Sequence, residues 1–433
     1  MNLLQEYLKI KKSRTYIRLI FWYNIFMTNK DIKYLNKLKF IFNSISILRL
    51  TSFFNKFFYP SSYIQYIEHS IQKFLACRDI QKGYLKLKCH KCQHLHTISL
   101  TCKSRLCPTC GFKYSQVWTQ KIAAQVLNIN HRHVLFTIPK QCRMFFFYDR
   151  TLLVKLSHAV NEVFKYQFHN IYKKKQRVNY IPPSSDKYFT DSDVVHYGLL
   201  TVIHTFGRDL KWNPHIHAIV SLGGFNKHFK FKKFDYFNVS SIAGQWKYHV
   251  LDIIKNGNYP NEKIKRMAKK TVSELYEKDT RFFFNVGNGD VNNTKGIIRY
   301  LGRYLARSPI AEYKITNITD DEVTFVFDDL KTGEKQQSTM NIERFAQQVL
   351  VHLPPKNFKM VNRYGFYARR ICDKLKLAIK PFMKNISKPK FSFYQSQMYI
   401  TFGINPFYCP NCKVRMRVWE FYHYRYPAPR RYY

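Results

Sequence analysis

The chain has 433 residues, and 45% of them are hydrophobic, which suffices for one sizeable core with one or two smaller satellite domains. Its 72 Lys and Arg against 27 Asp and Glu give a formal net charge of +45, far beyond what solubility requires, so a polyanionic partner is expected. The longest apolar stretches near the N-terminus are too short to span a bilayer, and no small-residue cleavage site follows them, which argues against a membrane partner and predicts a cytoplasmic protein.

Nucleic acid is the polyanion that this charge favours, because neutralising phosphates releases condensed counterions and supplies affinity independent of base sequence. An AT-rich genome would also enrich Lys, but it would hardly explain the deficit of acidic residues. Some of the 37 Phe and 32 Tyr could stack on unpaired bases, although most are expected in the core.

The N-terminal third of the chain divides into two regions. Residues 1–58 are Lys-rich and aromatic-rich without a clear period, and they are left as an unassigned basic extension. Residues 59–130 are predicted to form a small zinc-binding, DNA-recognising domain. Apolar residues at helical spacing predict one helix over residues 63–75 and a second one that carries Trp118 and Leu127.

Two closely spaced cysteine pairs in this region can close a tetrahedron of thiolates around one structural Zn²⁺: Cys89, Cys92, Cys107 and Cys110. Disulfides are disfavoured in a reducing cytoplasm. Cys77 and Cys102 are extra thiols that could be buried spacers, and Cys102 is also a candidate zinc ligand. Metal binding would supply folding energy to a segment too small for its own core.

The C-terminal region, residues 346–433, contains a further pair, Cys409 and Cys412, with a proline between them as in a metal knuckle. This pair is half a site. Its missing partners could be His423 or residues far away in the sequence.

Residues 131–345 are predicted to form the catalytic domain. The β-branched and aromatic segment 133–138 predicts a strand that Pro139 ends, and Asp149 is a plausible N-cap of the helix that follows. After a polar loop at 173–193, strands are expected at 197–206 and 215–222, joined by a turn. A hairpin is expected around residues 328–333.

The segment His215-Ile216-His217 alternates, so a strand would place both imidazoles on one face, where they could hold one divalent ion. His204 ends the preceding strand, and the turn could bring it beside His215 as a third ligand. A structural interpretation of these histidines remains open, because His-x-His is common by chance.

A helix is predicted from Gly296 to Arg307, stopped by Pro309. Its i,i+4 pair Tyr300 and Tyr304 lies between an apolar sector and a basic one. The basic sector is a candidate for DNA backbone binding and consists of Arg299, Arg303 and Arg307. The alternative is two amphipathic tyrosines at a packing edge.

Together the two motifs favour nuclease chemistry. A phenol with a pKa near ~10 is a poor nucleophile at neutral pH, and a metal that polarises the scissile phosphate would lower the barrier and orient the attack. No Gly-x4-Gly-Lys phosphate loop is found, so a host helicase or replication machinery is a candidate partner.

Over roughly residues 63–370 the chain resembles the rolling-circle HUH transposases of the insertion sequence 91 family. The matching segments include the cysteine cluster from residue 77 to 110, the strand at 133–139, the stretch 204–217 with its histidines, and the two-tyrosine motif at 300–310. The N-terminal extension and the C-terminal tail depart from the family pattern.

The resemblance implies an α+β, HUH-endonuclease-like fold, in which a central antiparallel sheet flanked by helices follows a small helical zinc-knuckle domain. It also implies Mg²⁺ or Mn²⁺ at the catalytic site, although imidazole ligands alone would favour Mn²⁺, Zn²⁺ or Ni²⁺ over Mg²⁺. Some relatives take the third ligand from the tyrosine helix, but Ser308 stands one turn beyond Tyr304 and is a poor ligand, which favours His204.

The function expected from these features is a transposase that nicks and rejoins single-stranded DNA at element ends, and joins it to target DNA, through a 5′-phosphotyrosine intermediate. A plasmid replication initiator or relaxase with the same chemistry is the second hypothesis. A non-catalytic, zinc-dependent DNA-binding protein is the third.

Overall fold

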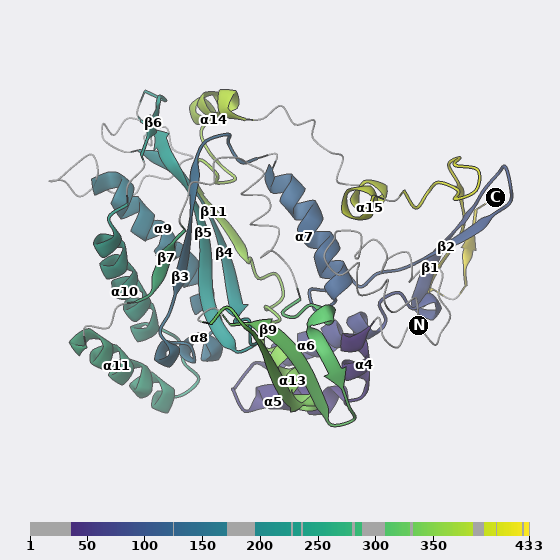
Figure 1. Cartoon of the computed structure of the whole chain (residues 1–433), viewed down its shortest axis with the longest axis horizontal. Coiled ribbons are helices and arrows are strands. Elements are labelled where there is room, and N and C mark those ends of the chain that lie inside the picture. The colour runs from purple at the N-terminus through teal and green to yellow at the C-terminus, as the bar shows by residue number, and fades with distance from the viewer. Residues whose placement is uncertain are drawn as a thin grey trace.

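The computed structural model describes residues 36–123, 125–170, 195–226, 228–234, 237–278, 282–287, 308–329, 332–383, 394–403, 405–426 and 428–432. Its elements form three antiparallel sheets with helices around them (Figure 1). The expected α+β class, with antiparallel sheets flanked by helices, is confirmed.

The largest sheet has the order β11-β4-β5-β3-β7, and β6 pairs with the end of β5. Its two long central strands, β4 and β5, form a hairpin that is almost wholly buried. The strands are β3 His131–Thr137, β4 His196–Phe206, β5 Trp212–Phe225, β6 Phe231–Lys233, β7 Phe284–Val286 and β11 Val361–Gly365.

Three helices cover one face of this sheet, as Figure 1 shows: α9 Leu152–Asn170, α10 Val239–Lys255 and α11 Glu262–Glu277. Asparagines cap two of them, because Asn238 Oδ1 accepts from Ser241 N, at 2.9 Å, and Asn261 Oδ1 accepts from Ile264 N, at 3.0 Å. The sheet residues that pack against these helices alternate along each strand, for example Ile216 on β5. Burial of this face supplies most of the core.

The opposite face of the sheet is covered in part by α7 Pro108–Ala123 and α14 Asp373–Ile379. Their cluster includes Leu200 and Val202 of β4 and Ile219 of β5. Because strand residues alternate between faces, this is also the face on which residues 204, 215 and 217 lie.

A second unit joins the N-terminal helices to a three-stranded sheet of order β10-β9-β8. Residues 36–55, which the sequence left unassigned, contribute two helices to its core. The elements are α4 Lys37–Asn43, α5 Ile47–Asn55, α6 Ser61–Leu75, β8 Ile315–Ile318, β9 Glu322–Asp328, β10 Lys335–Asn341 and α13 Ile342–Leu350.

Arg150 links this unit to the large sheet. Its fully buried guanidinium donates to Tyr59 Oη, at 2.7 Å, and to the carbonyls of Val351 and Leu353, at 2.7 and 3.1 Å. It also lies 5.0 Å from the ring centre of Trp212 at the start of β5. A single cation thus satisfies carbonyls of one unit and stacks on an aromatic ring of the other.

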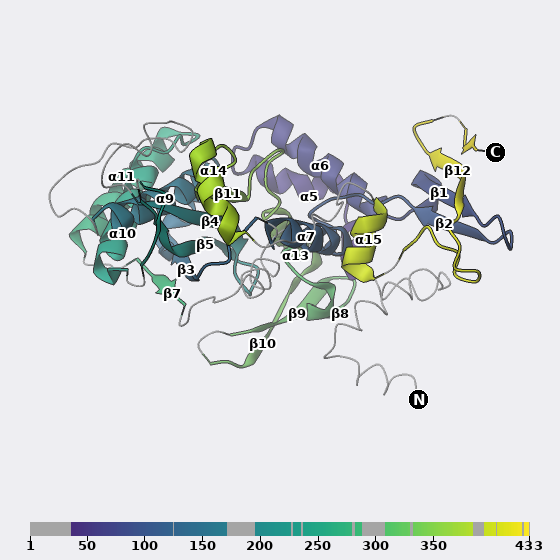
Figure 2. The same ribbon diagram turned by 90° about the horizontal axis from the view of Figure 1, so that it is seen from above.

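The third sheet has the order β13-β12-β1-β2 and combines a hairpin from residues 83–99 with two strands from the C-terminal region. Figure 2 shows it at one end of the molecule, away from the large sheet, with α15 Tyr394–Phe402 between them. Its strands are β1 Gly83–Lys88, β2 Leu95–Ser99, β12 Arg417–His423 and β13 Arg430–Arg431.

Sequence expectations and element bounds agree closely at the strands. The strand expected at 133–138 is β3, and those at 197–206 and 215–222 are β4 and β5. Asn213 and Pro214, expected in the turn, instead lie inside β5, which begins at Trp212. Asp149 precedes α9 as expected, and its carboxylate accepts from Thr151 N at 2.9 Å. The helix expected at 296–307 lies outside the described residues.

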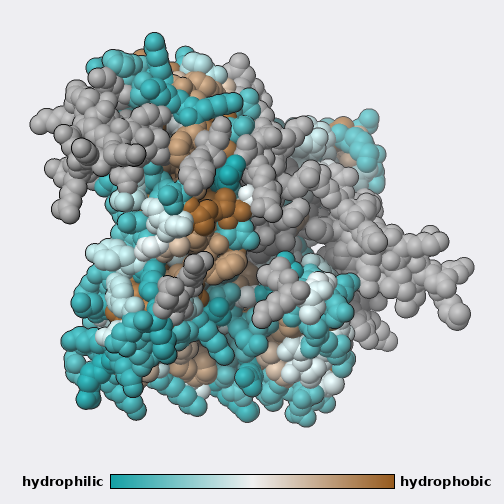
Figure 3. Space-filling model, turned by 60° about the vertical axis from the view of Figure 1, so that its left-hand side comes forward, coloured by the Kyte–Doolittle hydropathy of each residue, from teal (hydrophilic) through white to brown (hydrophobic). Residues whose placement is uncertain are grey.

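On the face seen in Figure 3, hydrophilic side chains cover the lower part, and hydrophobic side chains gather in a band higher up. Helix α11 contributes a run of exposed basic residues to the surface: Lys263, Lys265, Arg266, Lys269 and Lys270. Among the described residues, no helix combines the length and apolar character needed to cross a membrane.

Gly365 at the end of β11 is a position where only glycine fits. Its φ is 59°, and an added Cβ would stand 1.7 Å from the Tyr197 carbonyl oxygen. We expect Gly365→Ala to lower the free energy of unfolding by at least about 3 kcal/mol. Alanine would strain the backbone at this φ, and its Cβ would also force β4 to move away.

Gly333→Ala is the matched control in urea denaturation. Gly333 also has a left-handed φ, of 73°, but nothing lies within 4 Å of the position of its added Cβ. Gly333→Ala should therefore lower the free energy of unfolding by only about 1 kcal/mol, which is the backbone strain alone. Equal losses in the two variants would contradict the steric argument.

Candidate functional site

Three histidines meet on one face of the large sheet. His204 on β4 is directly opposite His215 on β5, and His217 follows two residues later on the same face. The centre of the His204 ring lies 5.3 Å from that of His215 and 4.7 Å from that of His217, and the His215 and His217 centres are 4.9 Å apart. One nitrogen from each ring lies within 4.8 Å of the others, so the structure brings the three candidate ligands together.

The hydrogen bonds and burial of these rings suit metal binding. His215 Nδ1 donates to the Asn213 carbonyl at 2.7 Å, so the lone pair of this imidazole is on Nε2. Burial lowers the pKa of His215 to about 4. Burial, and then the neighbouring histidines, hold the pKa of His217 well below its usual range. The His215 and His217 rings are therefore neutral at pH 7, as a ligand must be.

His133 on β3 belongs to the same group, and the sequence reasoning gave it no role. Its Nε2 lies 3.2 Å from His217 Nδ1, and the two rings stack with their centres 5.4 Å apart. The pairing of β3 with β5 explains this, since His133 is opposite Ile219 and so shares a face with His217. The alternation of residues 133, 135 and 137 was the signal that could have indicated it.

The other catalytic candidates are the tyrosines and arginines of the expected helix at 296–307. All of them lie outside the described residues: Arg299, Tyr300, Arg303, Tyr304 and Arg307.

Four buried cysteines cluster where α6, the loop after β2 and the start of α7 meet: Cys77, Cys102, Cys107 and Cys110. Cys77 Sγ lies 3.9 Å from Cys107 Sγ and 3.8 Å from Cys110 Sγ, and Cys102 Sγ lies 3.6 Å from Cys110 Sγ. Four sulfurs about 2.3 Å from a central zinc would be about 3.8 Å apart. These separations match a tetrahedral zinc site and are far too long for disulfides.

This grouping corrects the single zinc site expected from the two cysteine pairs at 89/92 and 107/110. Cys107 and Cys110 are joined by Cys77 and Cys102, whereas Cys89 and Cys92 face Cys409 and Cys412. The physical reason is the β1–β2 hairpin, which carries residues 89–94 in its turn, away from α7. The extra ligand suspected in Cys102 is in the first group, and Cys77 is there too. His423 belongs to neither.

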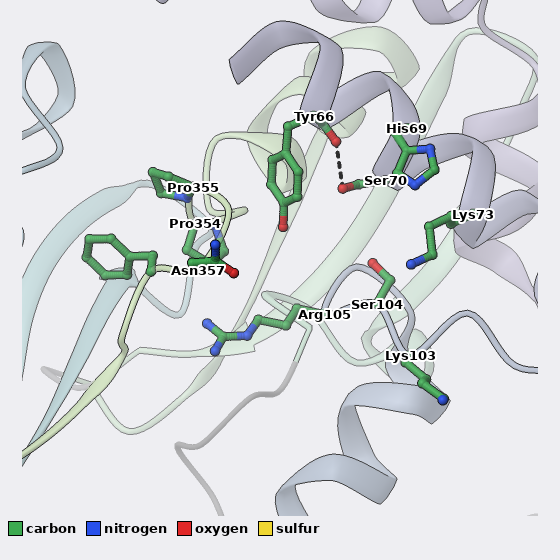
Figure 4. Close-up of a pocket in the computed structure, with 11 residues that line it drawn as sticks. Tyr66, His69, Ser70, Lys73, Lys103, Ser104, Arg105, Pro354, Pro355 and Asn357 are labelled. Carbon is green, nitrogen blue, oxygen red and sulfur yellow. Dashed lines mark hydrogen bonds between the residues drawn. The ribbon is translucent and has the colours of Figure 1, made fainter. Parts of the chain in front are cut away.

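A basic pocket of about 250 Å³ lies beside this cysteine cluster (Figure 4). Its walls come from α6, from the loop at 103–105 and from the loop after α13. None of the residues that line it is acidic, and four of them are basic or histidine: His69, Lys73, Lys103 and Arg105. Figure 4 shows the Arg105 guanidinium extending toward Asn357 across the pocket.

Comparisons with known proteins cover both the histidine segment and the Cys77 cluster. A family model described as "Putative transposase" matches residues 198–374, which contain the three histidines and both tyrosines. A model described as "Transposase zinc-binding domain" matches residues 49–138, which contain all four cysteines of the Cys77 cluster. The resemblance to the insertion sequence 91 family of transposases is confirmed. The zinc-binding match begins at Arg49, inside the segment that the sequence left unassigned.

Two curated relatives extend the likeness over most of the chain. The "Transposase for insertion sequence element IS801" of Pseudomonas savastanoi pv. phaseolicola is 27% identical over 361 residues, which is 80% of this chain and 82% of the relative. The "Putative transposase y4qJ" of Sinorhizobium fredii is 22% identical over 326 residues, 68% of this chain and 72% of the relative. No solved structure gives a significant match.

Proposed function

We propose that this protein is a rolling-circle transposase that nicks and rejoins single-stranded DNA at insertion-sequence ends and transfers it to target DNA. The observation that carries the proposal is the convergence of His204, His215 and His217 on one sheet face, within a segment whose family match also spans Tyr300 and Tyr304. The relatives are described as transposases, which favours this activity over a replication initiator with the same chemistry.

The three histidines would hold one divalent cation, Mg²⁺ or Mn²⁺, whose chemistry is to polarise the scissile phosphate. His215 would bind through Nε2, because its Nδ1 donates to Asn213 O. His217 would also bind through Nε2, with Nδ1 donating to His133 Nε2. His133 thereby acts as a positioning residue that fixes the tautomer and the ring orientation of a ligand.

In the cleavage step a tyrosine oxygen attacks the phosphorus. The new bond is the 5′-phosphotyrosine ester, the bond from phosphorus to the 3′ oxygen breaks, and that oxygen takes up a proton to leave a free 3′-hydroxyl. Because the ester conserves the bond energy, the second tyrosine or a 3′-hydroxyl can complete strand transfer without ATP. Arg299, Arg303 and Arg307 are proposed to hold the DNA backbone.

The basic pocket of Figure 4 is proposed to bind a DNA phosphate next to the zinc-binding cluster. Replacing Lys73 and Arg105 with alanine is expected to weaken binding to single-stranded DNA at all sequences, and to reduce the slope of log affinity against log salt by about 0.7 for each lost contact. Fluorescence anisotropy over a salt series measures both quantities.

Lys255→Ala is the control for the pocket variant. Lys255 is an exposed cation at the end of α10, a helix that contributes no residue to the pocket. A pocket variant with the affinity and salt slope of this control would show that no phosphate binds there.

The test of the proposed function is covalent capture. Wild-type protein is incubated with single-stranded oligonucleotides that carry element ends and with Mn²⁺, and the products are run on a denaturing gel. The expected result is a protein band that carries the 3′-labelled strand segment downstream of the nick, joined through its 5′ phosphate, and this band should be lost when a chelator replaces Mn²⁺. If no element end gives the adduct, the proposed nuclease activity is contradicted and a non-catalytic DNA-binding protein is favoured.

A further inference from the structure

The second cysteine cluster joins the β1–β2 hairpin to the C-terminal region of the chain. Cys89 and Cys92 lie in the turn of the β1–β2 hairpin, and Cys409 and Cys412 precede β12. Cys92 Sγ lies 3.6 Å from Cys409 Sγ, close to the edge of about 3.8 Å expected for four thiolates around zinc. One ligand atom from each of the four residues lies within 4.8 Å of the others.

The two cysteine pairs have the same backbone conformation. In the first, Gln93 has a φ of 59°, Gln93 N donates to Cys89 O and Cys89 N donates to His94 O. In the second, Lys413 has a φ of 56°, Lys413 N donates to Cys409 O and Cys409 N donates to Val414 O. Both are therefore tight knuckles that present two thiols to one side, which disulfide formation would not require.

The backbone and the lysines around the two knuckles suit sulfur ligands that carry negative charge. Cys92 N donates to Cys89 Sγ at 3.5 Å, as backbone amides of a metal knuckle do toward a ligand sulfur. Each knuckle also carries a lysine between or next to its ligands, Lys91 and Lys413. Positive side chains at these positions would offset the net negative charge of a zinc held by four thiolates.

The sheet around this cluster has too small an apolar core to be stable alone. Its fully packed members are Leu87, Cys89, Cys409 and Met416. Strand β1 nevertheless pairs with β12 from Gly83 opposite His423 to Lys88 opposite Arg417. Small domains with little core commonly depend on a metal, and a structural zinc supplies about 10–16 kcal/mol to such a fold.

We propose that Cys89, Cys92, Cys409 and Cys412 bind a second structural Zn²⁺, which fastens the C-terminal segment to the N-terminal zinc-binding domain. The zinc-binding family match ends at residue 138 and so includes Cys89 and Cys92 without their partners. The complete ligand set requires a long-range contact, and the folded chain supplies it between Cys92 and Cys409, which are 317 positions apart in the sequence. This site goes beyond the proposed cleavage chemistry and does not depend on it.

Metal analysis of the purified full-length protein tests the proposal. Wild-type protein should contain two zinc ions per chain, one for each cysteine cluster, and the double variant Cys409→Ser with Cys412→Ser should contain one. Cys372→Ser is the matched control, because Cys372 lies in neither cluster, and it should retain both ions. One zinc per wild-type chain, or an unchanged content in the double variant, would overturn the proposal.

Two further measurements separate loss of the site from general unfolding. Cys412→His keeps a ligand that zinc accepts, so it should retain more zinc than Cys412→Ser. Limited proteolysis should release the segment from residue 405 onward much faster in the serine double variant than in the wild type, while the large sheet resists. If the serine variants do not fold, two measurements on the wild type decide. These are its zinc content and the spectrum of its cobalt-substituted form, which should report two all-thiolate tetrahedral sites.

Discussion

His217→Ala is expected to reduce the rate of single-strand cleavage by about a thousandfold, a loss of about 4 kcal/mol of transition-state stabilisation. The variant removes the imidazole that lies between His204, His215 and His133. Two histidines would remain, so metal affinity should fall together with the rate. Single-turnover cleavage at several Mn²⁺ concentrations, with calorimetric titration of Mn²⁺, measures the two effects separately.

His249→Ala is the control for this variant. His249 lies on α10, across the sheet from the three histidines, and its partial burial makes its removal a comparable structural perturbation. It should retain wild-type cleavage and Mn²⁺ affinity. Should His217→Ala bind Mn²⁺ as tightly as this control, the three histidines would not be the metal site, whatever the cleavage rate.

The histidine arrangement could be predicted because it depends on local rules. Strand alternation puts His215 and His217 on one face, and a hairpin of adjacent strands places His204 opposite His215. The same alternation, extended to β3, would have added His133, but only if the pairing of β3 with β5 had been known. The limit is that strand order does not follow from the pattern within each strand.

The cysteine clusters could be predicted only in part, for a related reason. The Cys-x2-Cys spacing correctly indicates a knuckle, because two cysteines so near each other in the sequence can bind one metal ion. It does not identify the partner knuckle. Proximity in sequence favoured joining Cys89 to Cys107, whereas pairing of β1 with β12 brings Cys409 to it instead. Such long-range pairing is set by tertiary structure and leaves no local signal.

The N-terminal helices show a different limit. Helix α5 packs Leu50 and Phe54 into the core of the second unit, although residues 1–58 lack a clear period as a whole. Apolar residues also stand on its exposed side, where Leu48 is 77% exposed, and they obscure the apolar stripe. Its amphipathic character is apparent only over nine residues, Ile47–Asn55, which is shorter than the window that sequence patterns need.

Replacing both Tyr300 and Tyr304 with phenylalanine is expected to abolish the covalent adduct completely, because phenylalanine keeps the aromatic ring and lacks the oxygen that is proposed to attack. In the helix expected at 296–307 an i,i+4 pair would lie on one face, so each phenol could reach the same scissile phosphate in turn. The single variants therefore decide the division of roles. Loss of the adduct in one single variant alone identifies the residue that attacks first.

The single variant that retains the adduct should then fail in strand transfer, because no second phenol is available to accept the next strand. Adduct formation in the denaturing gel and joined product on a labelled target strand measure the two steps on one sample. An adduct that persists in the double variant would exclude both tyrosines as nucleophiles while leaving the three histidines as the metal site. Another hydroxyl would then be the nucleophile. Mn²⁺ dependence of the residual adduct would indicate that this nucleophile still acts beside the metal held by the three histidines.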